Sequence, residues 1–293
     1  MHEFLGDGNE VIPILFDTDI GSDIDDAVAL AYLLKQPRCD LLGITTVTGD
    51  VQQRAALAEM ICRAAGRDVP IHCGARSVLL SGAGQPRVPQ YEAVKDLPHR
   101  MDRPEFTAVE FMLDTIRSRK GEIILLTVGP MTNLALMLSL DPTIVDHLRG
   151  IVSMAGEFFS APYCEWNVSC DPVASAISYN ARRKNHISVG LDVTMKVTMS
   201  KPEVKAKFTG PILSVVERMA QAWFTGTDLI TFHDPLAAAI IFHPGLCSYQ
   251  KGTVRADVEP SRTHFVPGAG DDVVAEKVDV PGFFTEYFEV LTT

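Results

Sequence analysis

Five carboxylates crowd a short stretch near the N-terminus of this chain. They are Asp17, Asp19, Asp23, Asp25 and Asp26. Carboxylates at this spacing repel one another unless a cation or a proton lies among them. Ligands that are all oxygen favour a hard ion, Ca²⁺ or Mg²⁺, over zinc. An EF-hand is not predicted, because a glycine holds the fifth position of the loop and no glutamate closes it at the twelfth.

Part of this aspartate loop has a purely structural explanation. Asp25 and Asp26 begin a helical pattern, where acids stabilise the helix N-terminus, and Asp23 can face solvent. Asp17 and Asp19 directly follow the apolar run 12–16. A structural role for two acids at that place is harder to justify. The loop therefore predicts a metal site.

The elements that must position this loop alternate between strands and helices. Short β-branched runs predict strands, and longer runs with helical periodicity predict helices. This order predicts an α/β fold with an open, mostly parallel central sheet flanked by helices. Ligands of such sheets collect beyond the carboxyl ends of the strands, where the loop would lie. The expected strands are 12–16, 41–47, 122–127, 151–154 and 187–191, and the expected helices are 25–36, 54–65, 133–140 and 173–180.

The second half of the chain is expected to be helical first and then to form strands. Residues 77–104 have a loop-like composition and predict a long surface or active-site excursion. No internal repeat or low-complexity tract is present, so we expect a single domain over residues 1–293. Helices are expected within 200–226 and directly after His233-Asp234-Pro235, strands at 263–268 and 272–280, and a closing helix at 281–293.

Composition and charge exclude several classes of partner. The chain has 293 residues and a formal net charge of −11, which argues against binding a nucleic-acid backbone. The six cysteines form no CxxC pair, and the first residues lack the pattern of a signal peptide. No apolar run is long enough to span a bilayer. These features predict a cytoplasmic protein that does not bind membranes.

Several segments together resemble the nucleoside hydrolase family, the inosine–uridine-preferring nucleoside ribohydrolases. The family opens on D-x-D-P-G-x-D-D-A-x-A-L, and this chain has DTDIGSDIDDAVAL, with Ile20 in place of proline and two extra residues before the Asp pair. Further segments follow in the family's order over nearly the whole chain. They are GITTVTGD (43–50), TVGPMTNLAL (127–136), IVSMAGE (151–157), EWNVSCDPVASA (165–176), VGLDVT (189–194) and FHDPLAAA (232–239).

The resemblance implies hydrolysis of the N-glycosidic bond of a ribonucleoside, a small-molecule substrate. Such a reaction passes through an oxocarbenium-like ribosyl cation that water attacks on one face. By resemblance, Asp19 is both a Ca²⁺ ligand and the general base for a metal-bound water. Asp26, Asp234 and the backbone carbonyl of Val128 would complete the metal shell. The family also implies a homo-oligomer, a dimer or a tetramer.

The resemblance also assigns residues to the substrate. Asp25 would bind a ribose hydroxyl, Met154 would lie beneath the sugar, and Glu165 and Asn167 match a ribose-gripping E-x-N pair. Asp50 stands near the sugar, where the family often has asparagine.

Two further assignments concern the leaving base. His233 matches a histidine that some members place near the base, where it either donates a proton or is hydrogen-bonded near the ion. Aromatic residues around Trp166 could stack on a base or could simply pack. These aromatic residues are Phe158, Phe159, Tyr163 and Trp166.

The departures from the family pattern keep two alternatives open. The family's His-Gly-x-x-Gly loop is missing from 77–104, and Phe159 stands where asparagine often contacts ribose. The protein could therefore be a non-catalytic nucleoside- or ribose-binding protein that keeps the fold and the ion. A less favoured alternative is a haloacid-dehalogenase-like phosphatase with Mg²⁺ and a nucleophilic Asp17.

Overall fold

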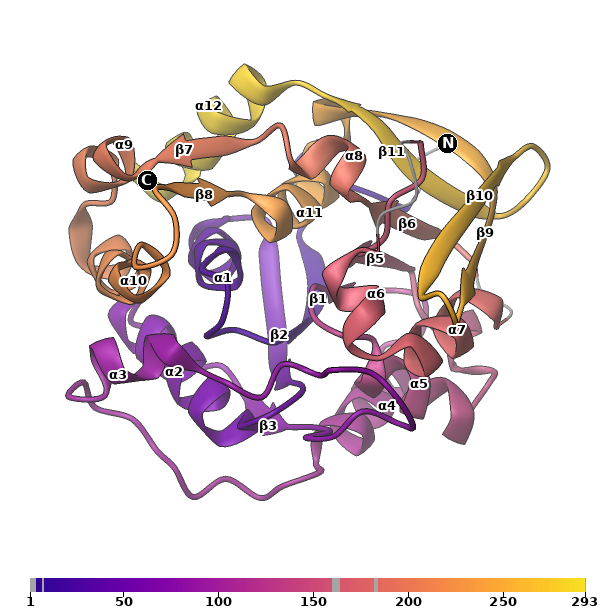
Figure 1. The fold of residues 1–293 in the computed structure, drawn as a ribbon, viewed down its shortest axis with the longest axis horizontal. Coiled ribbons are helices and arrows are strands. Elements are labelled where there is room, and N and C mark those ends of the chain that lie inside the picture. The colour runs from indigo at the N-terminus through magenta and orange to yellow at the C-terminus, as the bar shows by residue number, and fades with distance from the viewer. Residues whose placement is uncertain (1–3, 7, 160–163, 182–183, 293) are drawn as a thin grey trace.

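A computed structural model describes residues 4–6, 8–159, 164–181 and 184–292. Within these residues, nine strands form one sheet in the order β10-β9-β11-β6-β5-β4-β1-β2-β3. The run from β11 to β3 is parallel, and β9 and β10 are antiparallel at one edge (Figure 1). The strands are β1 (Ile12–Thr18), β2 (Cys39–Thr46), β3 (Ile71–Cys73), β4 (Ile124–Thr127), β5 (Gly150–Met154), β6 (His186–Val189), β9 (Cys247–Asp257), β10 (Arg262–Pro267) and β11 (Asp272–Val278).

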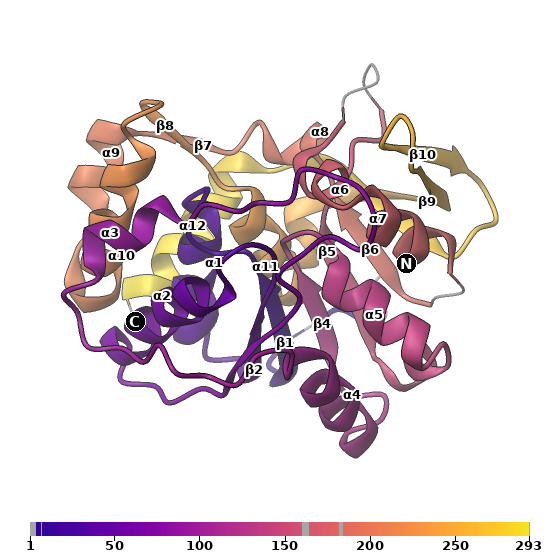
Figure 2. The same ribbon diagram turned by 60° about the horizontal axis from the view of Figure 1, so that its bottom comes forward.

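Helices cover both faces of this sheet, as the turned view in Figure 2 shows. A small second sheet pairs β7 (Thr198–Ser200) with β8 (Leu229–Thr231). The helices are α1 (Asp25–Lys35), α2 (Val51–Ala64), α3 (Pro89–Val94), α4 (Ala108–Ser118), α5 (Thr132–Leu140), α6 (Trp166–Cys170), α7 (Pro172–Asn180), α8 (Leu191–Thr194), α9 (Lys201–Lys207), α10 (Gly210–Trp223), α11 (His233–Phe242) and α12 (Val280–Thr292).

The interior strand β1 is apolar on both faces because a layer of helices lies on each side. Ile14 and Phe16 pack into the core that contains α1, α2, α11 and α12. Leu15, between them, points to the opposite core, which α4 and α5 contribute. Alternate residues of a strand face opposite sides, so two buried faces require the continuous apolar run of this strand.

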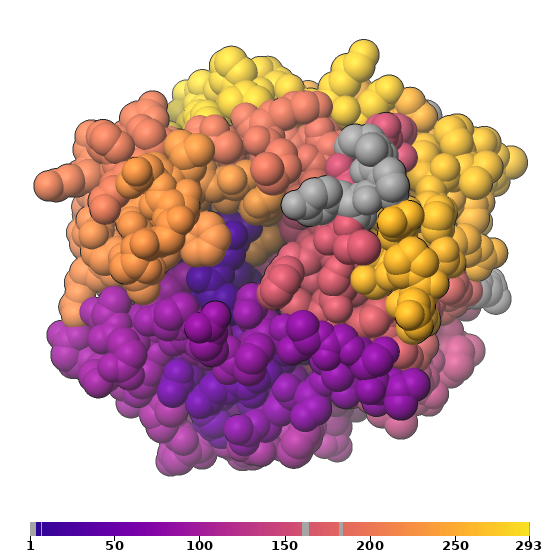
Figure 3. All heavy atoms as spheres, viewed as in Figure 1, coloured from indigo at the N-terminus to yellow at the C-terminus, as the bar shows by residue number. Residues whose placement is uncertain are grey.

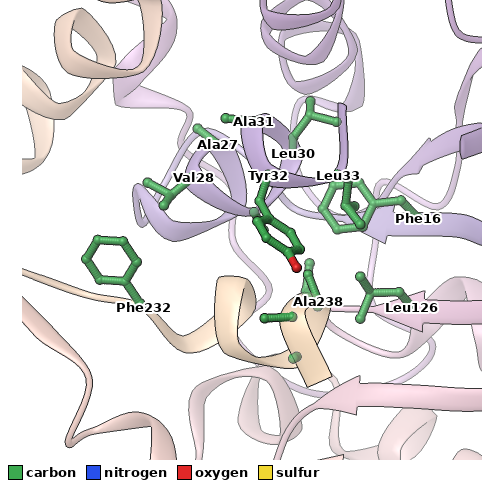
Figure 4. Packing of buried hydrophobic residues seen from close by; sticks show 14 of the residues in the cluster. Phe16, Ala27, Val28, Leu30, Ala31, Tyr32, Leu33, Leu126, Phe232 and Ala238 are labelled. Atoms are coloured by element: carbon green, nitrogen blue, oxygen red, sulfur yellow. The ribbon is translucent and has the colours of Figure 1, made fainter. Parts of the chain in front are cut away.

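Helix α1 is buried almost all round, which fixes the aspartates at its N-terminus. Its apolar side chains pack between Phe16 and Leu126 of the sheet and Ala238 of α11 (Figure 4). A helix that is apolar on every face belongs inside a protein. Asp25 and Asp26 therefore begin a helix held rigidly by the core, and they are not on a loose surface loop.

The predicted α/β class and the open, mostly parallel sheet are confirmed. Three boundary expectations were wrong. Leu191 begins α8 and does not end a strand, His233 begins α11 and does not precede it, and the predicted loop 77–104 contains α3. Strand β9 was not predicted, because exposed and half-buried residues interrupt it along much of its length and leave no sustained apolar run. Within the described residues, the helices are all too short or too polar to cross a bilayer.

Candidate metal and substrate site

The aspartate loop lies at a point where the strand order reverses. The chain leaves β1 through α1 to β2 on one side, yet β4 pairs with β1 on the other side. Where the connections after two neighbouring strands run in opposite directions, a crevice forms at the carboxyl ends of those strands. The segment after β4 comes close to this loop, because a Cβ added at Gly129 would lie 2.9 Å from Asp19 Oδ1. The fold therefore places the ends of β1 and β4 at one crevice.

Three carboxylates from two distant parts of the chain meet in this crevice. Asp25, Asp26 and Asp234 each offer an oxygen within 4.8 Å of the others, and all three are buried. The packing of α1 against α11 brings them together. Asp25 Oδ2 accepts a hydrogen bond from the Asp234 backbone N–H at 3.1 Å, and Thr18 Oγ1 donates to Asp26 Oδ1 at 2.5 Å.

Of the other two predicted ligands, Asp19 is not one of the three carboxylates that meet, and Val128 offers a backbone carbonyl. Asp19 is buried, and its charge raises the pKa of both Asp26 and Asp234. The Val128 carbonyl accepts a hydrogen bond from Asn167 Nδ2 at 2.8 Å. A carbonyl oxygen has a second lone pair, so this bond does not exclude a metal ligand there.

The electrostatics of the cluster call for a cation. Burial raises the pKa values of Asp25, Asp26 and Asp234 well above their usual range, and repulsion from neighbouring aspartates raises them further. Buried carboxylates that repel one another ionise together only when a positive charge lies between them. The donors are all oxygen atoms, which suits a hard divalent ion and fits Ca²⁺.

Arg54 of α2 is a buried cation beside these acids, and the sequence analysis missed it. Its guanidinium donates to the backbone carbonyls of Asp19 and Ile20, to Thr48 through Nε, and to Gln85 through Nη2. Arg54 is fully buried, and its charge lowers the pKa values of Asp19 and Asp26. One side chain thus ties the aspartate loop to the loops that contain Thr48 and Gln85. Its signal in the sequence was an arginine on the first turn of a helix, next to an apolar run.

Asp17 lies inside β1 and not in the crevice. Its Oδ1 accepts hydrogen bonds from Thr45 Oγ1 at 2.5 Å and Asn133 Nδ2 at 2.7 Å. Its Oδ2 is buried without a hydrogen-bond partner among the described residues, and burial raises the pKa of Asp17 to about 7. A carboxylate held in this way inside the sheet is badly placed for the nucleophilic role of the phosphatase alternative.

Three of the proposed ribose-binding residues, Met154, Glu165 and Asn167, form a hydrogen-bonded group. Glu165 caps α6, and its carboxylate accepts from the backbone N–H groups of Gly156, Asn167 and Val168 at 2.8–3.1 Å. Asn167 Nδ2 also donates to the Met154 carbonyl at 3.0 Å, and Met154 is buried. A carboxylate has about four acceptor positions, so Glu165 keeps little capacity for a sugar hydroxyl.

His233 begins α11, directly before Asp234. Its Nδ1 lies 2.7 Å from Thr194 Oγ1, which fixes the orientation of the ring. Burial lowers the pKa of His233 to about 4, so its imidazole is neutral at physiological pH. A neutral imidazole donates a hydrogen bond readily, but it is a weaker acid than the imidazolium ion.

The remaining candidates lie toward the surface. Asp50 caps α2 by accepting from Gln53 N–H at 3.0 Å. Trp166 is 53% exposed, and Phe159 is 41% exposed with its ring edge-on to Phe265. Figure 3, viewed from the same side as Figure 1, shows a hollow in the middle of the molecular surface, with indigo N-terminal atoms at its floor. Tyr163 lies outside the described residues.

The chain is similar to several known proteins over most of its length. The profile of the family described as inosine-uridine preferring nucleoside hydrolase matches residues 14–285. The chain is 29% identical to uridine nucleosidase 1 of Arabidopsis thaliana, over 84% of this chain and 78% of that protein. It is 30% identical to the non-specific ribonucleoside hydrolase RihC of Escherichia fergusonii, over 96% and 98%. A solved plant nucleoside hydrolase, PpNRh1, has the same fold, with a TM-score of 0.83 over 97% and 99% of the two chains at 22% identity.

Proposed function

This chain belongs to the inosine-uridine preferring nucleoside hydrolase family, and we propose that it hydrolyses a ribonucleoside to free base and ribose with the help of Ca²⁺. Family membership supports N-glycosidic hydrolysis as the reaction. The observation that carries the proposal is the meeting of Asp25, Asp26 and Asp234 at the point where the strand order reverses. These buried acids are costly to the fold unless a divalent cation offsets their charge.

We assign the metal shell to Asp19, Asp26, Asp234 and the carbonyl of Val128. A bound Ca²⁺ supplies charge stabilisation and a coordinated water of lowered pKa. Asp19 is the general base that accepts the proton of the attacking water. Its carboxylate lies beside the cluster, and the hydrogen bonds from Arg54 to the Asp19 and Ile20 carbonyls hold its backbone in place.

The remaining residues act on the sugar and the base. Asp25 binds a ribose hydroxyl from its buried position at the start of α1. Met154 forms part of the surface beneath the sugar, and Asn167 orients both Met154 and Val128 through its side-chain amide. Because the pKa of His233 is low, we assign it hydrogen-bond donation to the leaving base and not donation from an imidazolium ion.

Glu165, Asp50 and Trp166 are placed at the edge of the substrate. Glu165 contributes mainly by holding Asn167 in position, since backbone N–H groups occupy most of its acceptor capacity. We assign Asp50, which caps α2, to the vicinity of the sugar, and the exposed Trp166 is available to stack on a base. We further propose that residues 1–293 form one catalytic domain, and that the protein works in the cytoplasm as a homo-oligomer.

The first test is reducing-sugar release from a panel of purine and pyrimidine nucleosides, with added Ca²⁺ and after chelation. We expect release that chelation abolishes and Ca²⁺ restores. Saturable ribonucleoside binding without any release would instead identify a binding protein that keeps the fold and the ion. Release that is indifferent to chelation would remove Ca²⁺ from the proposal.

Asp19→Ala tests the assignment of the general base. Turnover should fall by about 10²–10⁴-fold, which is the usual contribution of general-base catalysis. Asp257→Ala is the matched control, because Asp257 is an exposed partner of His264 at the far edge of the sheet. A near-normal rate for Asp19→Ala would show that another group activates the water.

A further inference from the structure

A second charged cavity lies near the C-terminal end of α2, where its lining residues Glu59 and Arg63 stand about 8–14 Å along the helix axis from Arg54. Its volume is about 540 Å³. Its walls come from α2, from the start of the edge strand β3 and from the connection between α3 and α4. Figures 1 and 2 show this connection as a long outer loop. The residues that define this arginine cavity are Glu59, Arg63, Arg67, Asp68, His72, Arg100 and Arg103, with Pro70, Pro104 and Thr107 among the others that line it.

One carboxylate organises most of these arginines. Glu59 Oε1 accepts from Arg63 Nε and Nη2 at 2.8 and 2.6 Å. Glu59 Oε2 accepts from Arg103 Nη2 at 2.5 Å and from the Arg100 backbone N–H at 2.8 Å. Burial raises the pKa of Glu59, but these hydrogen bonds lower it by more, so that the pKa falls to about 2. Glu59 is therefore ionised and its acceptors are used, so it cannot also neutralise the remaining positive charge.

Positive charge is left over after these ion pairs are made. Four arginines line the cavity against two acids, Glu59 and Asp68. Arg67 Nη1 donates a long hydrogen bond to the Leu34 carbonyl, at 3.4 Å. Arg100 Nε pairs with the exposed Asp102 at 3.2 Å. An excess of arginine in a concave place stands out on a chain whose net charge is −11.

The cavity also offers a less polar wall. The His72 ring stacks on Phe111 with the ring centroids 4.0 Å apart, and its Nδ1 lies 3.1 Å from Thr107 Oγ1. Burial lowers the pKa of His72, which favours a neutral ring. Pro70 and Pro104 continue this wall. The site thus combines arginine forks with a surface that a flat or apolar group can cover.

We propose that the arginine cavity binds a small phosphate-bearing molecule of the size of a nucleoside monophosphate. The arginine fork matches phosphate oxygens two at a time. The cavity volume lies within the range of small-molecule sites. Glu59 holds Arg103, whose side chain is only 8% exposed, whereas the side chain of Arg100 is 60% exposed. The cavity is therefore lined by one fixed and one movable hydrogen-bond donor. This inference does not rest on the proposed hydrolysis, because it concerns a different cavity.

The test is calorimetric titration of the Ca²⁺-loaded protein with uridine 5′-monophosphate at low ionic strength. Arg67→Ala and Arg100→Ala remove the two guanidinium groups least committed to internal contacts, and both positions are exposed, so the fold is preserved. Arg117→Ala on α4 is the control, since Arg117 is also exposed and pairs with Asp141 outside the cavity. Uridine serves as the probe without phosphate.

We expect saturable binding of the monophosphate that each cavity variant weakens by about tenfold, the scale of one charge-assisted contact. Arg117→Ala should bind like the parent protein, and excess uridine should not displace the ligand. Equal binding by all variants would place the ligand elsewhere and overturn the proposal. Absence of saturable binding at millimolar monophosphate would overturn it as well. Neither result bears on sugar release from nucleosides, so the two proposals fail separately.

Discussion

Helix α2 joins two groups of charged side chains with opposite imbalance. At its N-terminal end, Arg54 is a single buried cation beside the acids of the crevice. At its C-terminal end, Glu59 is a single carboxylate that receives hydrogen bonds from two arginine side chains. In the first group the acids outnumber the cations, and in the second the arginines outnumber the acids. A buried charge needs a partner of opposite sign. Each imbalance therefore indicates the charge of the ligand that the group would bind.

The two groups also differ in how firmly the fold holds them. The aspartates begin helices α1 and α11, which pack together in the core, whereas the arginines line an outer loop and the edge of the sheet. Burying charged side chains in a rigid core costs folding free energy, and such charges indicate a catalytic site. Charged side chains on a surface loop can adjust their positions, and they indicate a ligand-binding site. Four predictions test this contrast.

The largest expected effect follows from removing one acid of the crevice. Asp234→Ala should lower kcat/KM for the best nucleoside by about 10³-fold, since losing one partner of a buried charged group costs about 3–5 kcal/mol. The measurement is sugar release at saturating Ca²⁺. Glu59→Ala at the other end of α2 should change this rate by less than about threefold. Comparable losses in both variants would erase the functional distinction between the two groups.

The second prediction concerns the cation of the crevice. Arg54→Met keeps the length of the side chain but leaves the carbonyls of Thr48 and Gln85 without their buried donor. Destabilisation of about 3 kcal/mol is expected in urea unfolding without metal. Added Ca²⁺ should stabilise the variant more than the parent, because one positive charge fewer faces the acids. If Ca²⁺ gave the variant less stabilisation, Arg54 would act mainly by shaping the metal site.

The third prediction is the stabilisation that Ca²⁺ gives to the parent protein. At a hundred times its Kd, the ion should add about 2.7 kcal/mol, which is a rise in Tm of roughly 5 °C or more. The double variant Asp25→Asn/Asp26→Asn should lose this rise in a thermal unfolding scan. A rise that persists in the double variant would locate the bound ion away from the crevice.

The smallest effect is expected in the arginine cavity, at the C-terminal end of α2. Glu59→Gln should destabilise the fold by about 1 kcal/mol at neutral pH, the upper range for a partly exposed ion pair. The pKa of Glu59 is lower in the folded protein than in the unfolded chain, so its stabilisation is complete above about pH 4.5. It is lost as the pH falls toward about 2. Urea unfolding of both proteins should therefore converge at low pH, and a constant difference would exclude the ionised form of Glu59 as the cause.

Local patterns in the sequence were sufficient for the framework. Apolar periodicity predicted the β–α alternation, and the aspartates after the run 12–16 predicted a charged site at the carboxyl ends of the strands. Both inferences depend on residues close together in the chain. The boundary at Leu191 was missed because α8 has only four residues, and the boundary at His233 because α11 begins with two polar residues before its apolar run. The resemblance to a family, and no local pattern, pointed to Asp234.

Only the tertiary structure decided which charges meet. Asp234 bonds to Asp25 across 209 residues because α11 packs against α1, a contact that no local spacing encodes. Glu165 was predicted to bind ribose, but neighbouring backbone N–H groups occupy most of the acceptor positions of its carboxylate. Arg54 reads as a solvated helix residue and proves to be the buried link between three loops. Sequence determined which side chains are available, and packing determined which of them are buried together, because burial and long-range contact depend on how the helices close on the sheet.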